Sequence, residues 1–91
     1  MYILKCSDGS YYIGHSNSLE ERIRAHNAGR AAKWTACRLP VMLVYKETYQ
    51  SEQQSIRREC QIKRWSHQKK EALISGDIKT LKILSKSRNR L

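Results

Sequence analysis

The sequence predicts an α+β fold in which a small three-stranded sheet, mixed or antiparallel, has helices packed against it. Two observations support this prediction. The chain has 91 residues, the size of one domain with a single modest core. Three short segments rich in β-forming residues are separated by turn signals and by serine-led patterns typical of helix starts. The expected order of elements is β-β-α-β-α-α, followed by a short further helix.

The first two strands are expected over residues 2–6 and 11–15, on either side of a hairpin turn at Asp8-Gly9. The register of this hairpin decides how Tyr2 and Tyr12 face. A two-residue turn places them on opposite faces of the sheet, whereas one extra loop residue, such as a bulge at Gly9, places both on one face. The sequence leaves these two registers open.

A first helix is predicted to begin at Leu19, because Ser18 and Glu21 form the S-x-x-E pattern of a capping box. It should run to about Asn27 and stop at Gly29. Residues 28–39 then read as a basic loop.

Pro40 opens the third strand, over residues 41–47, and its apolar run predicts a strand covered on both faces. Ser51 and Gln54 form a second capping pattern, which starts a helix expected to reach about Trp65.

Ser66 is positioned to cap another helix, ending near Gly76, and Asp77 to cap a last one through Leu84. The expected organisation is one domain with a polar basic tail, over residues 1–86 and 87–91 respectively.

Composition narrows the class of partner. Eighteen Lys and Arg against eight Asp and Glu give a net charge of +10, which attracts polyanions, nucleic acid before anionic membrane. No apolar run has the roughly 20 residues of a membrane span, and the N-terminus lacks a signal-peptide layout. The widely spaced Cys6, Cys37 and Cys60 show neither zinc nor disulfide spacing and are expected to be buried, reduced thiols. These features predict a cytoplasmic protein.

Glu59 is a charged residue at a position where the helix pattern predicts an apolar one. On the predicted helix it lies at helical spacing from Ile56 and Ile62, at or beside the buried stripe. A carboxylate there needs a compensating cation, metal or set of donors. From these residues alone, an ion pair with a neighbouring Arg or Lys is favoured over a metal site.

Arg22 and His26 are four residues apart on the first helix and therefore share a face. The arginine fork suits a phosphate, and the imidazole can transfer a proton near neutral pH. The alternative is a solvated helix face with a histidine that favours the helix dipole. Tyr2 and Tyr12 are, by the same argument, packing residues with wet hydroxyls or members of a site.

Together these residues resemble the GIY-YIG endonuclease domain of homing endonucleases, restriction enzymes and the C subunit of excision repair. The resemblance covers roughly residues 1–75 and is closest to the compact, stand-alone bacterial branch. Tyr12-Ile13-Gly14 matches the YIG half of the signature, and Tyr2 stands where the GIY tyrosine belongs. Arg22 and His26 match the family's helical arginine and histidine, and Glu59 its metal-binding glutamate. The Gly-Ile before the first tyrosine is missing, and no distal asparagine can be placed.

The resemblance implies a metal-dependent endonuclease, with DNA favoured over RNA and low sequence specificity, and it suggests a role in DNA repair. One Mg²⁺ or Mn²⁺ ion is expected on Glu59, and Arg22 is expected to hold the scissile phosphate. Tyr2 is favoured as the base, with His26 as its hydrogen-bond partner and Tyr12 positioning water or metal.

Other basic residues predict a surface that tracks the nucleic-acid backbone, with an aromatic ring for stacking on a base. They are Arg30, Lys33, Trp34, Arg38, Arg57, Arg58, Lys63 and Arg64. One alternative is a non-catalytic nucleic-acid-binding module. Another is a basic subunit that docks on a protein partner through the last helix. A protein partner could equally target the nuclease to its substrate.

Overall fold

A computed structural model describes residues 1–89 and contains three strands and five helices in that range. The strands are β1 (Tyr2–Lys5), β2 (Tyr11–Gly14) and β3 (Met42–Lys46). The helices are α1 (Leu19–Asn27), α2 (Lys33–Ala36), α3 (Glu52–Lys63), α4 (His67–Ser75) and α5 (Ile78–Asn89).

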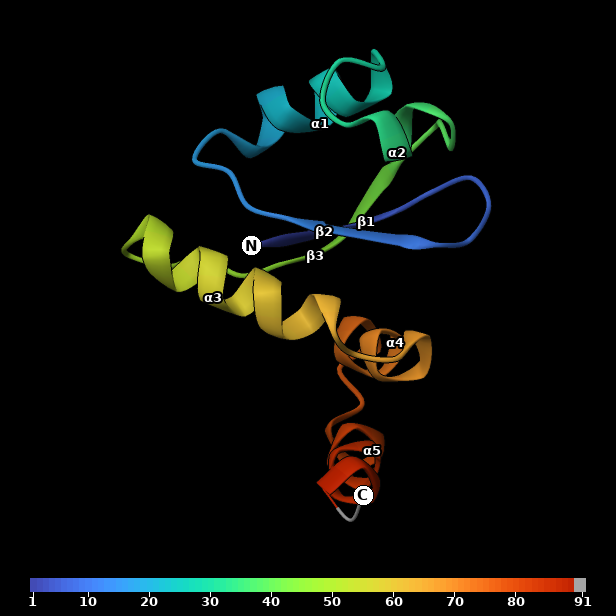
Figure 1. Ribbon diagram of the computed structural model, residues 1–91, viewed down its shortest axis with the longest axis vertical. Helices are drawn as coiled ribbons and strands as arrows, with labels where there is room; N and C mark the ends of the chain where they lie inside the picture. The colour runs from blue at the N-terminus through green and yellow to red at the C-terminus, as the bar shows by residue number, and fades with distance from the viewer. Residues whose placement is uncertain (90–91) are drawn as a thin grey trace.

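The three strands form one antiparallel sheet in the order β2-β1-β3, so the chain's first strand lies in the middle. Helices α1 and α2 cover one face of this sheet, and α3 with α4 lies on the other (Figure 1). The predicted α+β class with a three-stranded sheet is confirmed, and of the two open sheet types the antiparallel one is found.

The hairpin has an extra loop residue, and its position settles the register. Cys6 pairs with Ser10 across a three-residue loop that ends at Gly9, where φ is +85°, the bulged turn that a glycine favours. Leu4 therefore lies opposite Tyr12, and Tyr2 opposite Gly14. Because side chains alternate along a strand, both tyrosines face α1.

Side chains on the two faces of β1 belong to two separate core clusters. Ile3, with Met1 and Ile13, packs against Ile62 of α3. Leu4, with Tyr2, belongs to a second cluster on the α1 side of the sheet. The central strand therefore anchors both halves of a thin molecule, and Tyr2 is itself a core residue.

The expectation that the third strand is covered on both faces holds only in part, because its side chains pack on both sides of the sheet but stay partly exposed. Strand β3 lies at the edge of the sheet, and Met42 at its start is 63% exposed. Its apolar run faces the core through Leu43, Val44 and Tyr45, which pack as partly buried members of the two clusters. A run of apolar residues cannot by itself tell an edge strand from a central one.

Two further expectations fail between β2 and β3. Ser18 is the N-cap of α1, but its side chain makes no capping hydrogen bond, so the first capping box does not form. The basic loop contains the short helix α2, which begins at Lys33 and whose N-cap residue, Ala32, provides no side-chain cap. Of the three cysteines only Cys6 is buried; Cys37, just after α2, and Cys60, on α3, are exposed free thiols.

The helices of the second half begin where their caps predict. The Ser51 and Gln54 capping box is complete, and the Ser66 side chain accepts a hydrogen bond from the backbone of Lys69 at the start of α4. Asp77 caps α5 by accepting from the backbone N–H of Thr80 at 3.1 Å.

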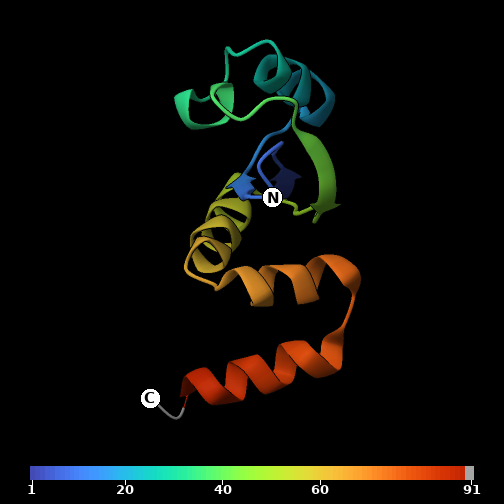
Figure 2. The same cartoon turned by 90° about the vertical axis from the view of Figure 1, so that its right-hand side faces the viewer.

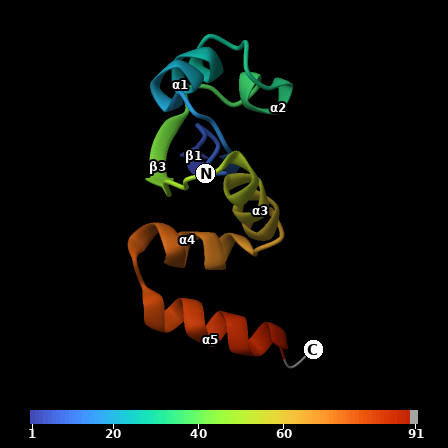
Figure 3. The same ribbon diagram turned by 90° about the vertical axis from the view of Figure 1, so that its left-hand side faces the viewer.

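Helix α5 runs to Asn89 rather than ending at Leu84, and the last two tail residues lie outside the described range. Figures 2 and 3 show α5 lying beyond α4, on the side away from the sheet. Within residues 1–89, no helix combines the length and apolarity of a membrane span.

Candidate active site

Two tyrosines from neighbouring strands meet beneath α1. The ring centroids of Tyr2 on β1 and Tyr12 on β2 are 6.4 Å apart. The Tyr2 side chain is almost fully buried, while Tyr12 is partly exposed. Burial raises the pKa of the Tyr2 phenol, and the guanidinium of Arg22 opposes that rise. The site thus contains a buried phenol beside a fixed positive charge.

Helix α1 supplies Arg22 and His26 from the same face, as their spacing predicts. Arg22 interacts with the hydroxyls of Tyr2 and Tyr12, which raise the pKa of its guanidinium. Its Nε atom is buried and has no hydrogen-bond partner among the described residues. An unpartnered buried donor is costly, so Arg22 keeps hydrogen-bonding capacity that its protein neighbours do not satisfy.

His26 is fully buried and joins Tyr2 to the short helix α2. Its Nε2 lies 3.0 Å from the Tyr2 hydroxyl, and its Nδ1 lies 2.9 Å from the hydroxyl of Thr35. Burial lowers the pKa of His26, and the positive charge of Arg22 lowers it further. The imidazole is therefore neutral at pH 7 and able to accept a proton.

Glu59 on α3 is 8% exposed and is held by two partners. Lys63 Nζ is 2.8 Å from its Oε1, and His15 Nδ1 is 2.5 Å from its Oε2. Burial alone would raise the pKa of Glu59, but the hydrogen bonds from Lys63 and His15 outweigh burial and lower it. A buried, ionised carboxylate is what both an ion pair and a metal ligand, the two roles considered for Glu59, require.

His15 is a site residue that sequence reasoning missed. It follows β2 directly, and its other ring nitrogen, Nε2, lies 3.6 Å from the exposed Glu52. Its partner Glu59 is 44 positions away, so no local pattern links the two. The only signal in the sequence is the position of His15, immediately after Tyr12-Ile13-Gly14.

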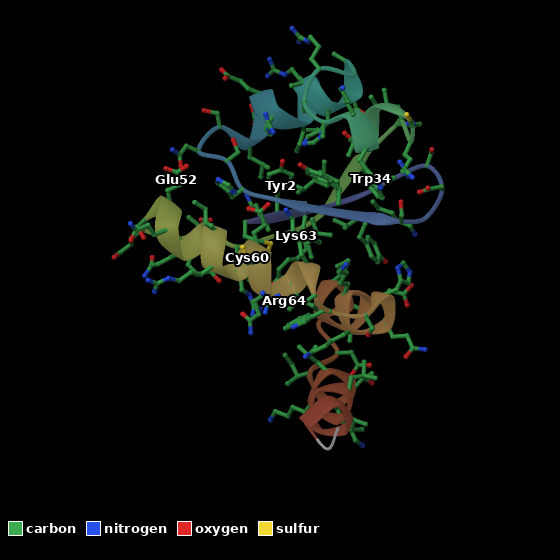
Figure 4. The ribbon with its side chains drawn as sticks, viewed as in Figure 1. Tyr2, Trp34, Glu52, Cys60, Lys63 and Arg64 are labelled. Carbon is green, nitrogen blue, oxygen red and sulfur yellow. The ribbon has the colours of Figure 1, made fainter. Side chains whose placement is uncertain are left out.

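The tyrosine cluster and the Glu59 cluster form one site at the β2 edge of the sheet. Helix α3 packs along β2, and Figure 4 shows Tyr2 and Lys63 at the same part of the sheet. The charge of Glu59 contributes to the pKa of Tyr2, and that of Tyr12 to the pKa of Lys63. Charge therefore couples Glu59 and Lys63 on α3 to the two tyrosines, which lie beside Arg22 and His26 of α1.

Gly14 is needed because the Tyr2 ring occupies the space of a side chain. A Cβ atom there would lie 2.6 Å from the Tyr2 hydroxyl oxygen and 2.7 Å from Cζ. We expect Gly14→Ala to displace Tyr2 from His26 and to lower the free energy of unfolding by about 1–3 kcal/mol, the usual cost of overpacking. Urea denaturation and the NMR signals of His26 measure the two effects.

The matched control for Gly14→Ala is Gly9→Ala. A Cβ at Gly9 has open space, but φ there is +85°, which costs about 1–2 kcal/mol for a residue with a side chain. This control should lose stability without disturbing His26. An unchanged His26 environment in Gly14→Ala would contradict the packing argument.

Acidification is expected to destabilise the fold through His26. Its pKa in the folded protein lies below the ordinary 6.5, so the unfolded chain binds the proton more readily. The free energy of unfolding therefore falls as the pH drops through 6.5. The lowered carboxylate pKa values of Glu47 and Glu59 act in the same direction only below their ordinary 4.5.

Urea denaturation at successive pH values checks this expectation. His26→Gln should flatten the dependence between pH 6.5 and 5, at roughly the pH where histidine titrates. A slope as steep in His26→Gln as in the native protein would show that another group causes the loss.

Several of the basic residues proposed for nucleic-acid contact are already engaged. Arg38 donates from Nε to Asp8 at 3.1 Å, and its guanidinium lies 4.1 Å from the centre of the Trp34 ring. Trp34, 40% exposed, also stacks on Tyr12 at 6.1 Å. These contacts form an aromatic and cationic column that leads outward from the tyrosine cluster.

On the other side of the sheet, Arg58 forms an ion pair with Glu47, at 2.9 Å from Nε. Arg57 and Arg64 line a groove of about 570 Å³ beside Trp65, which follows α3, and Figure 4 shows Arg64 on this lower side of the helix. Arg30 and Lys33, the other two proposed contact residues in the α1–α2 region, are exposed.

The family described as the GIY-YIG catalytic domain matches residues 1–72 of the chain. The chain belongs to the GIY-YIG family. The matched range includes β1, β2, α1 and α3, and so every residue of the two clusters. Of the described residues 1–89, those beyond it form the end of α4, the connection to α5, and α5 itself.

Curated relatives of this GIY-YIG chain are bacterial proteins named UPF0213. One from Staphylococcus saprophyticus is 48% identical over 75 residues, covering 82% of this chain and 92% of the relative. One from Staphylococcus haemolyticus is 47% identical over 74 residues, covering 81% and 90%. A solution NMR structure of the UPF0213 protein BH0048 from Bacillus halodurans is 40% identical, with a TM-score of 0.53 over 81% of this chain and 79% of that one.

Proposed function

We propose that this GIY-YIG chain is a divalent-metal-dependent endonuclease that hydrolyses phosphodiester bonds in nucleic acid, with DNA favoured over RNA. The observation that carries the proposal is the buried, unpartnered Nε of Arg22 beside the Tyr2 and His26 pair. One donor is ready for a phosphate oxygen, and the adjacent pair is ready to move a proton. Hydrolysis of a phosphodiester needs both functions.

Arg22 binds the scissile phosphate in this proposal. Its fork geometry matches two phosphate oxygens, and its fixed charge stabilises the negative charge that develops during attack. The same charge opposes the rise in the pKa of Tyr2 and helps to keep His26 neutral. Arg22 would therefore bind the phosphate and also lower the pKa values of Tyr2 and His26.

Tyr2 acts as the base toward the attacking water, with His26 as its hydrogen-bond partner. Little of a free tyrosine is ionised at pH 7 because its pKa is near 10, and burial raises the pKa of Tyr2 and so leaves still less phenolate here. The neutral imidazole 3.0 Å away can take up the phenolic proton. Tyr12, nearer the surface, positions the water.

The residues around Glu59 fit a magnesium or manganese ion. Magnesium commonly takes one or two carboxylates and completes its shell with water and phosphate oxygens. The described residues hold no group of three or more metal-ligating side chains, so Glu59 would be the main protein ligand. When bound, the ion would supply charge neutralisation at the phosphate. Lys63 and His15, which now hold the carboxylate, would orient it or give way.

Substrate affinity comes from charge in this proposal. The net charge of +10 gives salt-dependent binding without sequence preference. The outward column of Trp34 and Arg38 adds stacking next to the site. Low intrinsic specificity is therefore expected, and a protein partner would direct the nuclease to its target.

The test is cleavage by the purified protein of a panel of DNA and RNA, single-stranded, duplex and branched, with Mg²⁺, Mn²⁺ or EDTA. Tyr2→Phe, purified alongside, removes the hydroxyl and exposes any contaminating nuclease. Cutting that needs metal and is lost in Tyr2→Phe supports the proposal. Metal-independent cutting, or cutting that survives in Tyr2→Phe, contradicts it.

A non-catalytic nucleic-acid-binding module is the second candidate. The observation that favours it is that both oxygens of Glu59 already have cationic partners, as in a purely structural ion pair. It predicts salt-sensitive binding of the same substrates without cutting under any metal condition.

A further inference from the structure

Thr35 stands in an unusual position for a residue of a four-residue helix. It is completely buried, and its hydroxyl contacts two groups. The hydroxyl donates to the carbonyl of Ala32 at 3.0 Å, and it lies 2.9 Å from His26 Nδ1. No part of the function proposed above uses this residue.

Ala32, Thr35, His26 and Tyr2 form a row of hydrogen bonds, here called the hydrogen-bond chain, and its protons can be counted. A threonine hydroxyl has one hydrogen, and a carbonyl oxygen can only accept. If that hydrogen goes to Ala32, the Thr35 oxygen must accept from His26, so Nδ1 carries the imidazole proton. Nε2 of the neutral ring is then a bare lone pair, and it accepts the hydrogen of the Tyr2 hydroxyl. Every donor in the chain has an acceptor.

The opposite tautomer of His26 leaves one donor of the hydrogen-bond chain without an acceptor. With the proton on Nε2, His26 would donate to the Tyr2 oxygen, which already interacts with the Arg22 guanidinium. Thr35 would have to turn its hydrogen to Nδ1 and give up Ala32. The Tyr2 hydrogen would lose its only acceptor in the chain, inside a side chain that is 2% exposed. Leaving a buried donor unmatched costs about 1–3 kcal/mol.

We propose that Thr35 is a positioning residue that fixes His26 in the Nδ1–H tautomer, so that Nε2 faces Tyr2 as a proton acceptor. This inference rests on the proposed nuclease function, and it adds a direction to the proton's path. The short helix α2 positions this hydroxyl, because Ala32 is the N-cap of the helix and Thr35 its third residue.

The direction of transfer follows from the tautomer. As water attacks the phosphorus, its O–H bond breaks and the proton forms a new O–H bond on the Tyr2 oxygen. The original Tyr2 proton passes to Nε2, where an N–H bond forms, and His26 becomes an imidazolium. The departing sugar oxygen takes a proton from solvent, and His26 later returns its own proton to solvent. With the opposite tautomer, Nε2 has no lone pair to receive a proton.

The direct test is the tautomer itself, measured by long-range ¹H–¹⁵N NMR of the imidazole rings in the intact protein. The three histidines give separate signals, and His26→Gln assigns its own. We expect the Nδ1–H pattern for His26 at neutral pH. An Nε2–H pattern in the native protein would overturn the proposal, whatever the activity.

Thr35→Val and Thr35→Ser complete the test. Valine keeps the shape and removes the hydroxyl, so the tautomer should shift toward Nε2–H and kcat should fall at least tenfold with KM little changed. Serine restores the hydroxyl and should restore both the Nδ1–H pattern and kcat. An unchanged tautomer in Thr35→Val would overturn the role of the hydroxyl.

The two proposals fail in distinguishable ways. If the chain cleaves nothing, the NMR pattern still shows whether Thr35 fixes the tautomer. If it cleaves and Thr35→Val retains native kcat, the nuclease function stands and the role of Thr35 falls. Amide spectra of each variant identify any that do not fold, and the native tautomer decides in that case.

Discussion

Replacing Glu59 by alanine is expected to abolish metal-dependent cleavage while leaving nucleic-acid binding close to native. A bound ion contributes several kcal/mol of charge stabilisation, so its loss lowers kcat by roughly 10³-fold or more. The fold should survive, because the partners left behind, Lys63 and His15, have side chains 53% and 30% exposed. Neither becomes a buried, unpaired charge.

Binding of Mn²⁺, followed by calorimetry or electron paramagnetic resonance, separates ligand loss from other effects. Glu52→Ala is the matched control, since Glu52 is a carboxylate of the same helix that also faces His15 but is exposed. Glu59→Ala should lose both cleavage and Mn²⁺ binding, and Glu52→Ala should keep both. Retained metal-dependent cleavage in Glu59→Ala would remove Glu59 from the metal site.

Arg22→Ala should be nearly as damaging. The substitution removes the donor proposed to bind the phosphate, and loss of one such preorganised donor typically costs about 10²–10³ in kcat. It also removes the charge that opposes the rise in the pKa of Tyr2, so the phenol becomes a weaker acid. Cleavage should therefore be lost in kcat more than in KM, measured under single-turnover conditions.

Two variants interpret the Arg22 result. Arg22→Lys keeps the charge but not the planar fork, so we expect a partial recovery of kcat. Arg24→Ala removes an exposed arginine of the same helix that pairs with Glu20, and it should change only the salt dependence of binding. Equal losses in Arg22→Ala and Arg24→Ala would mean that the helix contributes charge alone.

The parts of the fold that the sequence predicts are those with a local chemical cause. The Ser51 and Gln54 capping box forms, α1 spans Leu19–Asn27 as expected, and α4 ends at Gly76. Ser18 shows the limit of this reasoning. Its pattern is the same kind as that of Ser51, but its φ of −129° and ψ of 75° are set by the chain arriving from β2, and its hydroxyl makes no cap.

The parts that sequence reasoning missed depend on contacts between distant residues. Helix α2 has four residues and no side-chain cap, so neither hydrophobic periodicity nor a capping pattern predicts it. Thr35 is linked to the site only by its contact with His26, and His15 only by its contact with Glu59. The five residues predicted for the site could be found because four of them lie within a single short stretch with family spacing. Their supporting partners carry no such spacing.

The hairpin register lies between these two cases. Asp8-Gly9 correctly marks the turn, and an extra loop residue puts Tyr2 and Tyr12 on one face, as one alternative expected. The pairing itself, Tyr2 with Gly14 and Leu4 with Tyr12, is shifted from the pairing that an extra residue at Gly9 would give. That the extra residue is Ser7, ahead of the turn, follows from the pairing of Cys6 with Ser10. Residues 7–10 are all small and polar, so their side chains do not choose among neighbouring registers.

The position of Tyr2 in the central strand has a consequence for how the protein tolerates heat. Its ring is a member of the core cluster with Leu4 and Val41, so the hydroxyl proposed as the base cannot move without repacking the interior. Many enzymes place their reactive groups on loops, which loosen before the scaffold melts. Here thermal inactivation and global melting should occur at the same temperature, and substitutions that stabilise the core should extend the working temperature range by an equal amount.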